Sequence, residues 1–303
     1  MNTIKALVKE NDKLIVKDMN KSLKPLKDEV LVKVELGGVC LTDIYIAEGI
    51  IESENVILGH ECSGTVVEIG TEVTNLKLGD LVSINPYIGC GECDHCKKNN
   101  FQLCLEQKAI GKDFDGVFSE YVLINSKNVV KFNKVSFERI AFFEPVLACS
   151  AVLNTSIKKE SKILIFGKNR IADLTNRILK ANGFKNVEFT EQIAEADYDY
   201  VIETARNSSE FDQALSALKP GGTLILKSRI FKSMGIDLYT ILRKNIKIEP
   251  AYYYDNIEHV VEMIENNLYL DDIIGKTYKL DQYEYVFEHS LQKGALKVFL
   301  KGE

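Results

Sequence analysis

The chain has 303 residues, of which 46% are hydrophobic and 27% are charged, and its net charge is −6. This composition is typical of a globular protein long enough for two domains, and it offers no basic face for general nucleic-acid binding. No apolar run approaches the length of a membrane span and the N-terminus shows no signal-peptide core, so we expect a cytoplasmic protein that contacts neither nucleic acid nor membrane.

The first 150 residues contain many short segments with the alternating pattern of β-strands. These segments are 4–19, 29–38, 63–70, 80–86 and 118–125, and glycines and polar turns separate them. No convincing long helix interrupts the series. This half of the chain is therefore predicted to form a barrel or a partly open β domain.

Four of the seven cysteines lie close together in "CGECDHCKKNNFQLC", as Cys90, Cys93, Cys96 and Cys104. An odd number of clustered cysteines, in a chain with no export signal, does not suggest a disulfide framework. A structural zinc site is a closed tetrahedron of four ligands, and spacing this short lets one loop supply all of them. The loop is predicted to bind a structural Zn²⁺.

From about residue 160 the pattern changes to alternating strands and helices, which indicates a parallel sheet with helices on both faces. The predicted elements are strand 162–166, helix 170–182, strands 186–190 and 198–202, helix 208–219 and strand 223–227. Further along, Asn256 is a plausible cap for a helix in "NIEHVVEMIENN", and "ALKVFLK" is the last strand.

The frame of a dinucleotide-binding unit is visible in "ILIFGKNRIADLTNRILKANG". When G-x-G-x-x-G is aligned on Gly167, Asn169 takes the second glycine position and Ala172 takes the third. Asparagine places a side chain where phosphate should approach, while Lys168 and Arg170 place two cations at a helix start. Either these cations contact phosphate and compensate for the lost glycine, or the chain has kept the frame and lost the nucleotide, and the residues alone do not separate the two readings.

The connection between the second and third predicted strands of this sheet is short. Only seven residues, 191–197, lie between them, whereas a crossover that contains a helix needs about ten or more. We therefore expect a trimmed sheet without the outermost strand on the adenosine side. Glu191 lies near the place where an acidic residue binds the ribose hydroxyls, which would favour NAD over NADP.

The order of these motifs resembles that of the zinc-dependent medium-chain dehydrogenases, the alcohol and polyol dehydrogenase family, over nearly the whole chain. The resemblance is carried by "GGVCLTD" (37–43), "GHECSGTVVEIG" (59–70), the four-cysteine loop, "FEPVLAC" (143–149), "ALKPGGTLIL" (217–226) and the terminal "ALKVFLK". It implies an α/β fold with two domains. The first would be a GroES-like zinc-binding catalytic domain at 1–148, completed by 270–303, and the second a shortened Rossmann-like nucleotide-binding domain at 149–269.

The resemblance also implies a catalytic Zn²⁺, the second zinc of the chain. Its ligands would be Cys40, His60 and Glu144, with one position left open as zinc catalysis requires. "FEPVLAC" resembles the polyol branch of the family, in which a glutamate in this stretch takes the place of a cysteine ligand.

Three further residues receive roles from the same resemblance. Thr42 would relay the substrate proton, and Asp43 would accept a hydrogen bond from the other imidazole nitrogen of the histidine ligand. Glu61 would either support the ligands or exchange with one of them. Which of Glu61 and Glu144 binds the metal at rest stays open.

The implied activity is a zinc-dependent oxidoreductase that interconverts a secondary alcohol and a ketone by hydride transfer with NAD(H), acting on a polyol, sugar alcohol or aminocyclitol. The implied cofactor-binding residues are Gly167, Lys168, Asn169, Arg170, Ile171 and Glu191. The alternatives are a zinc-binding partner or regulatory protein with impaired cofactor binding, and zinc chemistry without redox. A homodimer or homotetramer is expected from the family.

Overall fold

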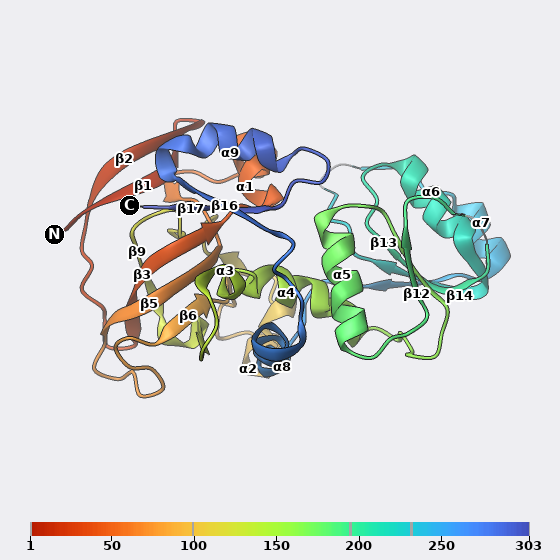
Figure 1. Cartoon of the computed structure of the whole chain (residues 1–303), viewed down its shortest axis with the longest axis horizontal. Coiled ribbons are helices and arrows are strands. Elements are labelled where there is room, and N and C mark those ends of the chain that lie inside the picture. The colour runs from red at the N-terminus through yellow and green to blue at the C-terminus, as the bar shows by residue number, and fades with distance from the viewer. Residues whose placement is uncertain (1, 99, 194–195, 231–232, 303) are drawn as a thin grey trace. The chain divides into compact units, whose positions relative to one another are not determined.

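The computed structural model describes residues 2–98, 100–193, 196–230 and 233–302. The chain forms two compact units, which Figure 1 shows in full. The first unit comprises Met1–Glu144 and Leu270–Glu303, and the second comprises Pro145–Tyr269. The last segment of the chain therefore returns to the unit in which the chain begins.

The first unit is built mainly of strands. They are β1 (Asn2–Glu10), β2 (Lys13–Lys21), β3 (Glu29–Gly38), β4 (Val56–Ile57), β5 (Glu61–Ile69), β6 (Leu81–Ile84), β7 (Tyr87–Ile88), β8 (Lys108–Ala109), β9 (Tyr121–Asn125), β10 (Val129–Phe132), β16 (Ile274–Lys279) and β17 (Lys297–Lys301). Its helices are α1 (Leu41–Ala47), α2 (Asp94–Lys97), α3 (Phe137–Ile140) and α9 (Tyr283–Ser290), and α4 (Phe143–Ser150) includes the boundary with the second unit. The β-rich prediction for this part of the chain is confirmed.

A seven-stranded sheet dominates the first unit, in the order β10-β6-β5-β3-β17-β16, with β9 also paired to β3. β3 and β5 are antiparallel, and their register places Gly38 opposite Glu61. On its other side the end of β3 pairs with β17, where Gly38 lies opposite Phe299. Segments from three distant parts of the sequence thus meet at the carboxyl end of β3.

The core of this sheet follows the alternation seen in the sequence. Val30, Val32 and Val34 of β3 are buried in one hydrophobic cluster with Val122 and Ile124 of the neighbouring β9. Each such side chain contributes about 1.5–3 kcal/mol when it leaves water. The packed face holds the ends of β3 and β5 rigidly, and these ends carry the site described below.

The second unit alternates strands and helices. Its elements are β11 (Ile163–Phe166), α5 (Arg170–Ala181), β12 (Val187–Thr190), β13 (Tyr198–Glu203), α6 (Ser208–Ala217), β14 (Leu218–Leu226), α7 (Leu238–Lys244), β15 (Lys247–Pro250) and α8 (Ile257–Glu262), which continues as a π-helical turn over Met263–Asn267. The predicted cap is present, because the Asn256 side chain accepts a hydrogen bond from the backbone N–H of His259.

The five strands of the second unit are all parallel, in the order β12-β11-β13-β14-β15. Chain order reverses between β11 and β13, which makes the gap between these two strands the switch point of a doubly wound sheet. In the described part of the chain no strand lies beyond β12, and β12 leads to β13 without a helix. The trimmed Rossmann-like sheet predicted from the seven-residue connection is confirmed.

Helices cover both faces of this sheet, as the alternation of strand residues requires. Ile163 and Ile165 of β11 are buried in a cluster that includes residues of α5, whereas Leu164 and Phe166 are buried in one that includes residues of α6. Successive residues of a strand point to opposite faces, so a short apolar strand must be covered twice. The chain as a whole therefore has a mixed α/β fold, with a β-rich first unit and a second unit of alternating strands and helices.

Candidate active site

The four-cysteine loop brings its thiols together. The sulfur atoms of Cys90, Cys93, Cys96 and Cys104 all lie within 4.8 Å of one another. Backbone amides donate to these sulfurs, from Cys90 to Cys104 Sγ at 3.4 Å, from Cys93 to Cys90 Sγ at 3.3 Å and from Cys96 to Cys93 Sγ at 3.5 Å. Such amides stabilise thiolates, and four thiolates at this separation fit a closed tetrahedral Zn²⁺ site.

The acidity of one of these thiols is already raised by the backbone. The amides of Glu92 and Cys93 donate to the sulfur of Cys90 and lower the pKa of its thiol to about 7. A thiol must lose its proton to bind a metal, so the backbone favours at Cys90 the charge state that zinc needs. At Cys96 the Gly91 amide lowers the pKa of the thiol, but burial and hydrogen bonds to the other three thiols raise it to about 12.

A second group of metal-binding side chains lies at the carboxyl end of β3. Cys40, His60 and Glu61 each offer a ligand atom within 4.8 Å of the others. Cys40 is the N-terminal cap of α1, and Glu61 is the first residue of β5, directly after His60. Because β3 and β5 pair in register at this end, two segments about 20 residues apart in sequence are brought side by side.

Asp43 links two of these residues. One oxygen, Oδ2, accepts the backbone N–H of Cys40 at 2.9 Å, and the other, Oδ1, lies 3.2 Å from His60 Nδ1. The Asp43 side chain is fully buried. With Nδ1 held by the carboxylate, Nε2 of the imidazole is the nitrogen left to bind a metal. Thr42 is next to this pair, with Oγ1 3.7 Å from Cys40 Sγ.

The charges around His60 show what this donor set requires. Burial lowers the pKa of the His60 imidazole, but the charges of Asp43 and Cys40 and hydrogen bonds to both raise it by more, so its pKa lies well above the usual range. The group thus attracts a positive charge to the imidazole. A divalent cation meets the same demand when it displaces the proton, so these residues fit Zn²⁺.

The sequence left open whether Glu61 or Glu144 is the carboxylate of this group. Glu61, and not Glu144, completes the group formed with the cysteine and histidine. Glu144 is buried nearby, where Tyr87 Oη donates to its Oε1 at 3.3 Å. Burial raises the pKa of Glu61 and the charge of Glu144 raises it further, although Lys297 lowers it. The two carboxylates are therefore close enough to interact, and Glu144 as a ligand stays a prediction.

Sequence reasoning did not identify the partner of Glu61. Lys297 of β17 forms an ion pair with Glu61 Oε2, and its ammonium also donates to Val39 O at 2.9 Å. The side chains of Lys297 and Glu61 are only 7% and 2% exposed. A Cβ on Gly38 would lie 2.5 Å from Glu61 Oε2, so only glycine leaves room for this buried pair. Four successive residues of β17 are buried, which hides the position from an argument based on alternation.

In the second unit, Gly167 begins the turn that corresponds to the dinucleotide fingerprint. Its φ is +124°, and a Cβ there would lie 2.1 Å from Thr204 Oγ1, so glycine is required at this first position. Asn169 has φ −120° and ψ 173°, an extended conformation that does not need glycine. Its side chain points to Thr204 and caps α5. Ala172, at the third position, is fully buried against the sheet, as close packing of helix and strand requires.

The other predicted cofactor residues lie on the surface around this turn. Lys168, Ile171 and Glu191 are exposed, and Arg170 is half-buried at the first position of α5. Glu191 directly follows β12, the edge strand. Lys168 thus places an exposed cation near the carboxyl end of β11, at the edge where doubly wound sheets bind ligands.

Sequence reasoning did not identify Glu203, which lies at the carboxyl end of β13. Its buried carboxylate accepts the backbone N–H of Ala205 at 2.9 Å, of Lys227 at 3.0 Å and of Ser228 at 3.2 Å, and the Ser228 hydroxyl at 2.9 Å. Burial raises the pKa of Glu203 although these donors lower it. The residue ties together the segments that follow β13 and β14.

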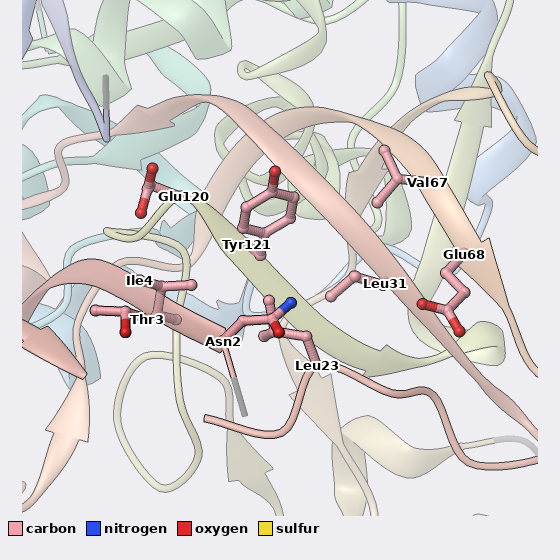
Figure 2. Close-up of a pocket in the computed structure, with 9 residues that line it drawn as sticks. All are labelled: Asn2, Thr3, Ile4, Leu23, Leu31, Val67, Glu68, Glu120 and Tyr121. Atoms are coloured by element: carbon pink, nitrogen blue, oxygen red, sulfur yellow. The ribbon is translucent and has the colours of Figure 1, made fainter. Parts of the chain in front are cut away.

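A separate hollow of about 470 Å³ lies on the first unit (Figure 2). It is lined by Asn2, Thr3, Ile4, Leu23, Leu31, Val67, Glu68, Glu120 and Tyr121. In Figure 2 the carboxylates of Glu68 and Glu120 lie on opposite sides of the Tyr121 ring. None of the predicted site residues lines this hollow, so it is not the centre of the chemistry.

Known proteins are similar to this chain in both sequence and fold. A family described as the alcohol dehydrogenase GroES-like domain matches residues 26–134. An L-threonine 3-dehydrogenase from Thermococcus kodakarensis is 30% identical over 88% of this chain and 88% of its own length. The chain belongs to the zinc-dependent medium-chain dehydrogenase family.

Solved structures agree with this family assignment. Acetophenone reductase from Geotrichum candidum, in complex with NAD, has a TM-score of 0.86 and 25% identity, with 99% of this chain and 98% of that chain covered. A protein from Sinorhizobium meliloti 1021 that is assigned as a zinc-binding dehydrogenase and bound to NADP has a TM-score of 0.91, 25% identity and coverage of 99% and 100%. This medium-chain dehydrogenase is therefore an oxidoreductase of the alcohol and polyol dehydrogenase type.

Within the described residues of the dehydrogenase, none of the helices combines the length and the apolar character needed to cross a bilayer.

Proposed function

We propose that this dehydrogenase interconverts a secondary alcohol and a ketone, with a polyol, sugar alcohol or aminocyclitol as the substrate class, and that it uses a catalytic Zn²⁺ and NAD(H). The observation that carries the proposal is the group formed by Cys40, His60 and Glu61 at the end of β3. Three protein ligands leave one position of a tetrahedron for a substrate oxygen, which distinguishes a catalytic site from the closed four-cysteine loop.

In this proposal the two bound groups supply distinct chemistry, because zinc polarises the substrate oxygen and NAD⁺ accepts the hydride from the carbinol carbon. Asp43 holds the imidazole of His60 through Nδ1, so that Nε2 points at the metal. Thr42 Oγ1, beside Cys40, takes the hydroxyl proton and passes it toward solvent. The carbinol therefore loses one hydride and one proton.

Lys297 forms an ion pair with Glu61 and holds its carboxylate beside Cys40 and His60. In this arrangement Glu61 would hold Zn²⁺ together with Cys40 and His60. Glu144 is the second carboxylate of the same buried region and is proposed as the alternative third ligand.

Cofactor use is proposed from the second unit. The carboxyl ends of β11 and β13 flank the switch point, which is where doubly wound sheets bind ligands. Glu191, exposed after β12, supports NAD(H) because a carboxylate near the ribose would repel a 2′-phosphate. Relatives of similar fold are bound to NAD in one case and to NADP in another, so the experiment compares the two cofactors.

The decisive experiment measures thermal unfolding of the zinc-loaded protein with millimolar NADH and, separately, NADPH, followed by a panel of alcohols and polyols. A ligand at 100 times its dissociation constant stabilises the folded state by about 2.7 kcal/mol, which is easily seen. A shift with NADH that exceeds the shift with NADPH, and oxidation of a panel member, support the proposal. No shift with either cofactor contradicts it and favours the partner or non-redox readings.

We also propose that the chain forms a homo-oligomer through the edge of its parallel sheet. β15 is the last strand of that sheet, and Ile248 on it is 40% exposed. On α7, which precedes β15, Leu238, Tyr239 and Leu242 are 61%, 71% and 79% exposed. Unpaired edges and clustered apolar side chains support a protein contact at this surface. Light scattering of the wild type and of Leu242→Lys tests it. The wild type should have the mass of an oligomer and Leu242→Lys a lower mass, and equal masses would contradict the proposed surface.

A further inference from the structure

In the proposed cofactor site, Asn169 stands where the dinucleotide fingerprint has its second glycine, and its side chain contacts Thr204. We propose that Asn169 is a positioning residue, which together with Thr204 holds the phosphate-binding turn in its cofactor-ready shape and so replaces the second glycine. The inference rests on the proposed use of a nucleotide cofactor. It predicts, against the fingerprint, that restoring glycine at 169 weakens cofactor binding.

The two residues face each other across the switch point of the sheet. Phe166, the last residue of β11, lies opposite Glu203, the last residue of β13. Gly167 and Thr204 therefore leave the sheet side by side, and the Thr204 hydroxyl occupies the space where a side chain at 167 would be, 2.1 Å from the position of its Cβ. A cofactor bound at the switch point would contact this edge.

The carboxamide of Asn169 uses its donors and its acceptor to bind this edge together. Nδ2 donates to Thr204 Oγ1 at 3.0 Å and to Thr204 O at 3.2 Å, and Oδ1 accepts the backbone N–H of Ala172 at 3.0 Å. Thr204 Oγ1 in turn donates to Phe166 O at 2.8 Å. One connected set of hydrogen bonds thus joins the first turn of α5, the end of β11 and the segment after β13.

This arrangement removes the expected obstacle to phosphate. The Asn169 side chain is directed at Thr204, which is only 4% exposed, and its backbone is extended and unstrained. The cap uses the amide of Ala172, and the start of α5 lies at the carboxyl end of β11, where doubly wound sheets bind phosphate. A glycine at 169 would lose the three hydrogen bonds of the Asn169 carboxamide and leave the turn free to move. The binding free energy of the cofactor would then have to offset the entropy lost when the turn becomes ordered.

The experiment measures the dissociation constant for NADH by fluorescence titration of zinc-loaded protein, together with thermal unfolding in the absence of cofactor. Asn169→Gly is expected to bind NADH about fivefold or more weakly than wild type. This factor corresponds to the net free energy of about one hydrogen bond. At saturating NADH its kcat should stay within about twofold of wild type, since the reacting atoms are untouched.

Thr204→Val and Thr204→Ser form the matched control pair on the other side of the contact. Valine removes the hydroxyl that Asn169 contacts and should weaken NADH binding by a similar factor, whereas serine keeps the hydroxyl and should restore it. In the Asn169→Gly, Thr204→Val double variant the losses should not add, because both substitutions break the same contact. A purely structural role would lower the melting temperature of the variants and leave the dissociation constant of the folded protein unchanged.

The outcomes separate the inference from the proposal beneath it. Wild-type protein that binds neither NADH nor NADPH overturns the proposed cofactor use and the role of Asn169 with it. Wild-type protein that binds NADH while Asn169→Gly binds equally well or more tightly overturns this inference alone.

Discussion

Replacing Lys297 by methionine tests how much the buried ion pair beneath the metal-binding group matters. Methionine keeps most of the apolar stem and removes the ammonium, which leaves the carboxylate of Glu61 without its cation. The side chains of Lys297 and Glu61 are 7% and 2% exposed, so water cannot replace the ammonium as the partner of the carboxylate. Breaking such a pair from one side costs about 3–5 kcal/mol, and the neighbouring charge of Glu144 places the expected loss toward the upper end of that range.

A double variant separates the charge from the packing. Glu61→Gln removes the unpaired charge, so Lys297→Met combined with Glu61→Gln should recover most of the loss. The remaining cost should be about 1 kcal/mol, the worth of the hydrogen bond from Lys297 to Val39 O that methionine cannot make. The double variant should therefore be about 2–4 kcal/mol more stable than Lys297→Met alone.

The assay is urea unfolding at pH 7, with zinc retained in the four-cysteine loop. A loss below about 1 kcal/mol for Lys297→Met would show that the pair is not buried in solution. A double variant no more stable than the single one would show that the effect comes from packing and not from the charge. Added zinc should stabilise Lys297→Met more than wild type, because the metal supplies the cation that Glu61 has lost.

Other predictions concern the metals, the strand ends and acid stability. Cys93→Ser and His60→Ala should each reduce metal content from two zinc ions to about one per chain, but only Cys93→Ser should unfold the four-cysteine loop, which zinc analysis and proteolysis would show. Gly38→Ala places a Cβ 2.5 Å from a buried carboxylate oxygen and should lower stability by about 1–3 kcal/mol in urea unfolding. The hydrogen bond from Lys219 lowers the pKa of Asp199. The pKa of Asp199 is therefore lower in the folded than in the unfolded protein. The interaction of Asp199 with Lys219 stabilises the fold above about pH 4, and this stabilisation disappears as the pH falls through the folded-state pKa. Asp199→Asn should therefore cost about 0.5 kcal/mol at pH 7 and nothing in strong acid, and a loss that is equal at both pH values would contradict this reading.

Local patterns explain why much of the fold could be read directly. Four cysteines within one loop cannot move far apart, so their spacing alone predicted a shared metal site. Alternating apolar residues marked the strands, and the seven residues at 191–197 were too few for a helix, which predicted the missing strand. Each of these inferences uses residues close in sequence, where chain geometry limits the choices.

Long-range pairing could not be read in the same way. Lys297 and Glu61 meet only because β17 and β5 flank the same end of β3. The closeness of Glu61 to Cys40 and His60 depends on side-chain directions within a packed core. The fingerprint predicted that Asn169 would obstruct phosphate, whereas the structure turns it toward Thr204.

The difference between the local inferences and the long-range contacts has a physical cause. Spacing and periodicity report what a short stretch of backbone can do, and that was enough to infer the zinc loop and the parallel sheet. The family was inferred from the resemblance carried by the motifs and their order. The direction of a carboxylate or a carboxamide depends on partners brought near by folding, whose positions no short stretch of this chain encodes. The ion pair of Lys297 with Glu61 and the contact of Asn169 with Thr204 therefore became visible only once the strands were assembled.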